Sequence, residues 1–84
     1  MLALLKELQT KPMILNIRTP DVFQVAYTDS RYIITIPYGC PFSFEDVNEV
    51  LNYIGERGIV QMISTMNTET FDESVVYKKN DLYV

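Results

Sequence analysis

The chain has 84 residues, no histidine and an excess of acidic over basic side chains that gives a net charge of −4 at neutral pH. This length allows one small domain, residues 1–84, whose thin core would gain stability from association with another chain. Without histidine, the commonest general base near neutral pH and the commonest zinc ligand are missing, so we expect no enzyme, no metal site and no cofactor. The scattered basic residues argue against direct nucleic-acid binding.

The single cysteine and the lengths of the apolar runs indicate in which cellular compartment the protein resides. Secreted domains of this size usually carry several disulfides, and Cys40 has no partner in the chain. The apolar residues 1–5 are followed at once by charged residues, which makes them too short for a signal sequence, and no run approaches the roughly 18 residues of a membrane helix. We expect a cytoplasmic protein with no membrane segment, and a Cys40 thiol packed in the core, because a catalytic thiol would need a base.

The first predicted element is a short amphipathic helix over residues 2–10, where apolar residues recur at helical spacing ahead of Pro12. Strands at 13–18 and 22–28 follow, and a third strand ends before Pro37. Turns at 19–21 and 28–31 bring the same face of all three strands into register. That face would carry Met13, Leu15, Ile17, Phe23, Val25, Tyr27, Tyr32, Ile34 and Ile36. The agreement between the two turns predicts an antiparallel meander with one covered face.

The next element is a second helix. Ser43 with Asp46 three residues later is typical of a capping box, so we expect this helix to run from about Phe44 to Arg57 and to end at Gly58. Its apolar residues share one arc, Tyr53 lies at the border, and the opposite arc holds Glu45, Glu49, Asn52 and Glu56.

A strand over residues 59–66 and a polar loop over residues 67–74 complete the ordered part of the prediction. In the tail, residues 75–77 and 82–84 would form either a small hairpin or an edge strand with a loose end. The predicted fold is therefore α+β, an antiparallel sheet of four to five strands that begins with the meander, with two helices packed on one face.

Acidic side chains are concentrated in residues 45–73, which hold seven of them against one basic residue. The acidic arc of the second helix has two interpretations, a solvated helix back or a docking face for a basic partner. The first is commoner in amphipathic helices. Two details favour the second, because Glu45 and Glu49 repel each other and Glu56 opposes the helix dipole.

The polar segment around Phe71 is a second candidate for docking. Glu69, Asp72 and Glu73 surround one large apolar side chain, which would either bind a partner or fold onto the core, the commoner outcome for such a residue. The carboxylates do not follow the spacing of a calcium loop. Tyr53 is likewise open to two interpretations, interface contact or packing at the core edge.

We therefore expect a small, acidic, noncatalytic protein-binding module that docks on a basic surface of a partner protein through Glu45, Glu49, Asn52, Tyr53, Glu56, Glu69, Phe71, Asp72 and Glu73. A sharper hypothesis is an inhibitor of the type encoded by phages and mobile elements, a nucleic-acid mimic that occupies its partner's nucleic-acid-binding surface. The alternative is a self-associating structural or accessory subunit, a homodimer paired through an edge strand or the tyrosine-rich tail. An enzyme built on Glu45 and Glu49 would lack a cleft.

Overall fold

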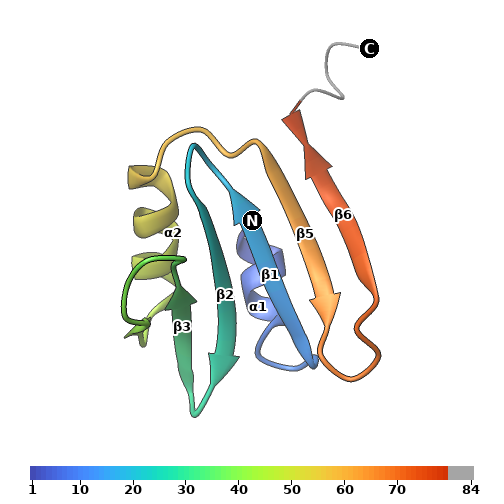
Figure 1. Cartoon of the computed structure of the whole chain (residues 1–84). Coiled ribbons are helices and arrows are strands. Elements are labelled where there is room, and N and C mark those ends of the chain that lie inside the picture. Colours follow the sequence, from blue (N-terminus) through green and yellow to red (C-terminus); the bar gives the residue numbers. More distant parts are fainter. Residues whose placement is uncertain (80–84) are drawn as a thin grey trace.

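A six-stranded antiparallel sheet forms the body of the computed structural model, which describes residues 1–79 (Figure 1). The elements in chain order are α1 (Leu2–Glu7), β1 (Met13–Arg18), β2 (Val22–Thr28), β3 (Arg31–Thr35), β4 (Phe42–Phe44), α2 (Val47–Glu56), β5 (Met62–Asn67) and β6 (Glu73–Lys78). The strand order is β4-β3-β2-β1-β5-β6, so β1 is central and β4 and β6 form the edges. The predicted α+β class is confirmed, with six strands rather than four to five.

The register of the meander agrees with the prediction. Leu15 pairs with Val25 and Ile17 with Phe23, while Tyr27 pairs with Tyr32 in the following hairpin. Asp29 and Ser30 form the tight turn of that hairpin with φ angles of 52° and 61°. A two-residue turn with positive φ at both positions matches the right-handed twist of the flanking strands, which fixes how β2 and β3 pair.

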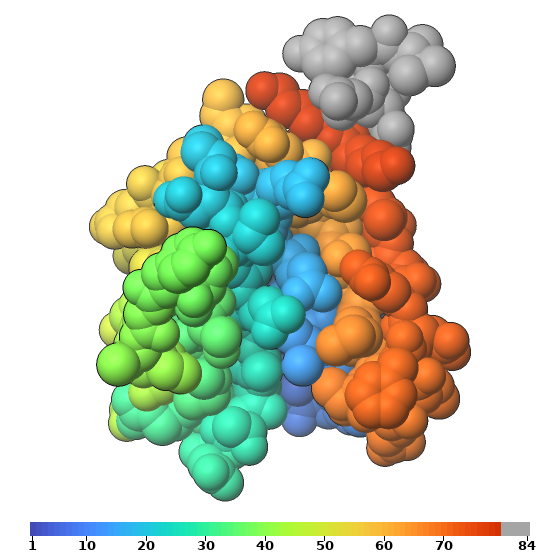
Figure 2. Space-filling view, viewed as in Figure 1, coloured from blue at the N-terminus to red at the C-terminus, as the bar shows by residue number. Residues whose placement is uncertain are grey.

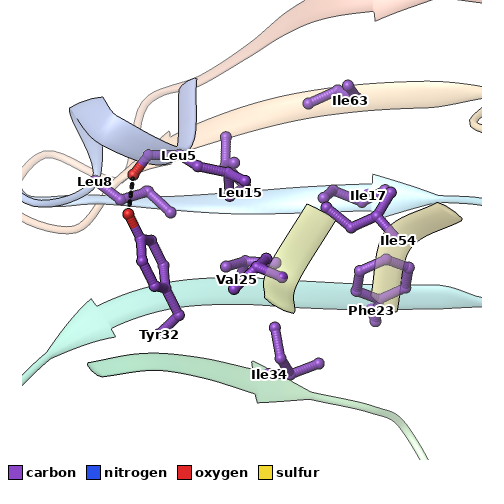
Figure 3. Close-up of a cluster of buried hydrophobic side chains, with 11 residues drawn as sticks. Leu5, Leu8, Leu15, Ile17, Phe23, Val25, Tyr32, Ile34, Ile54 and Ile63 are labelled. Carbon is purple, nitrogen blue, oxygen red and sulfur yellow. Dashed lines mark hydrogen bonds between the residues drawn. The ribbon is translucent and has the colours of Figure 1, made fainter. Parts of the chain in front are cut away.

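Both helices cover the same face of the sheet and enclose the core (Figure 3). α1 contributes Leu5 and Leu8, and α2 contributes Val50 and Ile54. The sheet contributes the alternate residues Leu15, Ile17, Phe23, Val25, Tyr32, Ile34 and Ile63. The Tyr32 hydroxyl donates a 3.0 Å hydrogen bond to the Leu5 carbonyl, drawn as a dashed line in Figure 3, and accepts one of 2.8 Å from the Gln9 amide. Tyr32 thus joins α1 to the sheet.

Neither α1 nor α2 lies over the opposite face of the sheet, which Figure 2 shows from the side used in Figure 1. Half-buried apolar side chains lie near its middle, where Ile14 is paired with Met66 and Ala26 with Ile33. Polar side chains such as Asn16 and Gln24 form the next row. None of the helices in residues 1–79 is long and apolar enough to cross a membrane.

Several element boundaries differ from the predictions. α1 ends at Glu7 and continues only as turns to residue 10, and β5 begins at Met62 rather than Ile59. The segment 42–44 forms β4, which was not predicted, because Phe44 pairs with Tyr32 instead of starting a helix. The tail prediction for residues 75–77 resolves into the edge strand β6. The part of that prediction on residues 82–84 lies outside the described residues.

The bond from Tyr32 to Leu5 gives a stability test. Tyr32→Phe removes the donor to the buried Leu5 carbonyl, which has no other donor within residues 1–79, and we expect the free energy of unfolding to fall by about 1–2 kcal/mol. Tyr27→Phe is the matched control, since its hydroxyl makes no hydrogen bond within residues 1–79, and it should cost less than about 0.5 kcal/mol. Urea unfolding measures both. Equal losses in the two variants would show that the bond does not clamp the helix.

Candidate functional site

The predicted acidic stripe is interrupted at its first residue. Asp46, not Ser43, is the N-cap of α2, and its carboxylate accepts a hydrogen bond from the Asn48 amide at 2.9 Å. Glu45 therefore lies before the helix, and its Oε1 accepts a 2.6 Å hydrogen bond from Arg31 Nη1. The predicted start near Phe44 is wrong, because pairing of aromatic residues in β4 with β3 prevails over the capping-box signal of Ser43.

What remains of the stripe is Glu49, Asn52 and Glu56, all exposed on α2. Neither glutamate takes part in an ion pair within residues 1–79. The seven helical steps from Glu49 to Glu56 span about 10 Å at ~1.5 Å rise per residue. This face of α2 is acidic, but it presents two carboxylates where the sequence predicted three.

Tyr53 packs at the edge of the core. Its ring meets the rings of Phe23 and Phe42 at centroid distances of 5.4 and 5.1 Å, and that of Phe44 at 6.1 Å. The Arg57 guanidinium lies 5.0 Å from the ring centroid of Tyr53. Edge-to-face aromatic contacts of this kind stabilise a fold by themselves, so Tyr53 needs no partner to explain its position.

The connection between β5 and β6 is a tight, internally bonded turn. The Asn67 side-chain oxygen accepts hydrogen bonds from the amides of Glu69 and Thr70 at 2.8 and 3.0 Å. The Asn67 backbone adds two more, its carbonyl accepting from the Phe71 amide and its amide donating to the Asp72 carbonyl. The predicted polar loop is therefore ordered by its own hydrogen bonds.

Phe71 lies at the tip of this turn with its side chain in solvent. It is 73% exposed and has a φ of 62°. Left-handed backbone is unfavourable for a bulky side chain, and such outliers concentrate at functional positions. Of the two interpretations of Phe71, packing onto the core is wrong, because the hydrogen bonds of Asn67 fix a backbone that directs the ring outward.

The other acidic residues of the segment are divided by the start of β6. Glu69 and Asp72 flank Phe71, are exposed, and form no ion pair in the part of the chain that the structure describes. Glu73 is the first residue of β6, and its Oε1 accepts a 3.2 Å hydrogen bond from Ser64 Oγ. We call Glu69, Phe71 and Asp72 the tip of the β5–β6 turn.

The acidic face of α2 and the tip of the β5–β6 turn are far apart. α2 lies beside the β4 edge of the sheet, and the turn belongs to the opposite edge (Figure 1). The structure therefore does not combine the predicted binding residues into one surface. The sheet separates them into two sites.

Two exposed residues lie between β3 and β4. Cys40, predicted to be packed, is exposed, and the nearby aromatic residue Tyr38 is fully exposed as well. Both lie in the turn between β3 and β4, within the segment bounded by Pro37 and Pro41. An open hollow of about 380 Å³ lies beside Tyr38, lined also by Pro20, Val22, Ile36, Tyr53 and Arg57. Among residues 1–79, no group of three or more His, Cys, Asp or Glu is arranged to hold a metal ion.

Comparison with known proteins places no restriction on the function of this site. No protein-family model matches the chain, and no curated protein or solved structure shows a match. Any functional assignment therefore depends on the chemistry and geometry described above.

The exposed position of Phe71 predicts an unusual response to substitution. Phe71→Asn removes no packed side chain and places at this left-handed position a residue that tolerates it, so stability should stay constant or rise by up to about 1 kcal/mol. Phe42→Asn, the control in the aromatic cluster around Tyr53, should lower stability by about 2 kcal/mol or more. Thermal unfolding measures the difference. A comparable loss from Phe71→Asn would mean that its ring packs on the core.

Proposed function

We propose that this chain is a noncatalytic protein-binding module that inserts Phe71 into an apolar pocket of a partner protein whose rim is basic. The observation that carries the proposal is the conformation of Phe71, a large apolar side chain held 73% exposed on left-handed backbone by an ordered turn. A solitary exposed apolar residue is common on protein surfaces. The combination with backbone strain is not, and it supports a role for the ring outside the folded chain.

The energetics support Phe71 as an anchor for binding. Leaving a phenylalanine ring in water forgoes about 2–3 kcal/mol of burial, and the left-handed backbone costs about 1–2 kcal/mol more. A partner pocket would recover the burial term, and aromatic residues dominate the energetics of many interfaces. The hydrogen bonds from Asn67 hold the turn before binding, so little conformational entropy is lost on complex formation.

The charges around Phe71 indicate the chemistry of the partner. Glu69 and Asp72 flank the ring and are free of ion pairs within residues 1–79, so lysine or arginine side chains beside the pocket would meet them. The net charge of −4 and the carboxylates of Glu49 and Glu56 would add long-range attraction without direct contact. The sharper hypothesis of an inhibitor that mimics nucleic acid stays a prediction. The structure gives it less support than the sequence did, because α2 presents two carboxylates instead of three.

The experiment places a photo-crosslinking phenylalanine analogue at position 71 and, in a control protein, at Tyr38, which is also aromatic and exposed but lies in the turn between β3 and β4. Both proteins are irradiated in a lysate of the source cells at low and at high salt. We expect one discrete adduct from position 71, weakened by salt, and none of that mass from position 38. Mass spectrometry then identifies the partner and the residues that line its pocket.

Charge variants distinguish the two acidic surfaces. Binding to the identified partner should fall at least roughly tenfold in Phe71→Asn and in the double variant Glu69→Lys/Asp72→Lys. It should change only a few-fold in Glu49→Lys/Glu56→Lys, the charge-matched control on α2. Retained binding in Phe71→Asn combined with loss in the α2 variant would transfer the docking face to the helix. Absence of any adduct from position 71 would contradict the proposed function.

A further inference from the structure

The edge strand β6 is the part of the sheet most open to another chain. It pairs with β5 on one side and has no strand on its other side within residues 1–79. All six of its residues are exposed, and Val75, Val76 and Tyr77 are large apolar residues among them. By comparison, β4 at the other edge has only three residues, all half-buried. A long, exposed, apolar edge strand is a template for pairing with a further strand.

The pairing of β6 with β5 is irregular at one position. Glu73 pairs with Met66 and Lys78 with Met62, so five steps along β6 correspond to four steps along β5. The extra residue is accommodated by a β-bulge between the pairs Ser64–Val75 and Ile63–Tyr77.

The bulge decides which side chains share a face. In a regular strand, residues five positions apart point to opposite faces. Met62 and Met66 are four apart and lie on one face, so the bulge brings Glu73 and Lys78 onto that same face, the one without helices. Ser74 and Tyr77 share the other face in the same way, because their partners Thr65 and Ile63 are two residues apart.

This arrangement makes β6 complementary to itself. A two-fold axis perpendicular to a sheet keeps each face on the same side in both copies, so residues opposite each other across the axis must point to the same face. When β6 pairs antiparallel with its own copy, two kinds of pair meet this condition. They are Glu73 opposite Lys78 and Ser74 opposite Tyr77. Glu73 then lies opposite Lys78 of the second copy, twice in each dimer, and Val75 lies opposite Val76 at the centre.

We propose that two copies of this chain pair antiparallel through β6 about such an axis, joining two six-stranded sheets into one of twelve strands. The charge match selects a second copy as the partner strand, since both ends of β6 find an opposite charge in it. Opposite charges across strands attract, and like charges at the same place repel. Glu73 is already held in position through Oε1 by Ser64, and its Oε2 makes no hydrogen bond in the described chain.

A bulge on an edge strand usually discourages pairing with foreign strands, which run straight. In a symmetric dimer both copies of β6 carry the bulge at the same residue, so the two paired strands contain the same number of residues over the same length. The same feature would therefore favour a second copy over other chains. This inference does not depend on the proposed function, because Phe71 lies in the turn before β6 and either surface can act without the other.

The test uses charge reversal and mixing. Sedimentation of the wild-type chain should show a mass that rises with concentration from 9.7 kDa towards twice that value. Glu73→Lys alone and Lys78→Glu alone each place like charges opposite each other, and should weaken association roughly tenfold or more. An equimolar mixture of these two variants restores both opposite-charge pairs and should dimerise like the wild type. The double variant Glu73→Lys/Lys78→Glu should also recover.

Glu69→Lys is the matched control, since it makes the same change of charge outside the strand and should dimerise normally. Circular dichroism of each variant verifies the fold, and the double variant keeps the test decisive if one single variant is destabilised. A wild-type chain that remains monomeric up to millimolar concentration would overturn the proposal. So would a single variant that associates like the wild type, or a mixture that gains nothing over its components.

Discussion

The pairing of β1 with strands on both of its sides is the constraint from which the surfaces of this protein follow. Leu15 lies between Val25 and Thr65, and Ile17 lies between Phe23 and Ile63. A slip of one residue would exchange the two faces of the strand and expose the entire core set. Because β1 is fixed from both sides, β2 and β5 are fixed as well, and the remaining strands take their register from them.

The two helices of this small chain cover only part of one face of its sheet. α1 and α2 pack over the side chains that centre on Leu15 and Val25. The cover does not extend to β6, where Tyr77 shares a face with the buried Ile63 and is nevertheless exposed. The hairpin of β5 and β6 is therefore rigidly attached along β1 and free along its outer edge and at its tip. A small domain in this form has a stable body and a separate exposed edge.

The sequence predicted the features that depend on period-two patterning and on local turns. The β1–β2–β3 register followed because two turns, placed separately, put the same apolar residues on one face. The start of α2 was missed, since the signal of Ser43 and Asp46 is local, whereas the competing pairing of Phe44 with Tyr32 joins residues far apart in the chain. The ion pair of Glu45 with Arg31 depends on that same strand. The sequence left the position of Phe71 open for another reason, because hydrophobicity alone favours burial and gives no account of the turn that Asn67 imposes.

Amide hydrogen exchange, followed by NMR in a solution dilute enough to keep the chain monomeric, tests most directly whether β6 is a free edge on a fixed sheet. We expect the slowest exchange in β1, which is paired on both sides beneath both helices. In β6 we expect a mixed pattern, with amides that face β5 protected and the others exchanging at nearly unprotected rates. Uniform protection of β6 at the level of β1 would show instead that the edge is covered within the monomer.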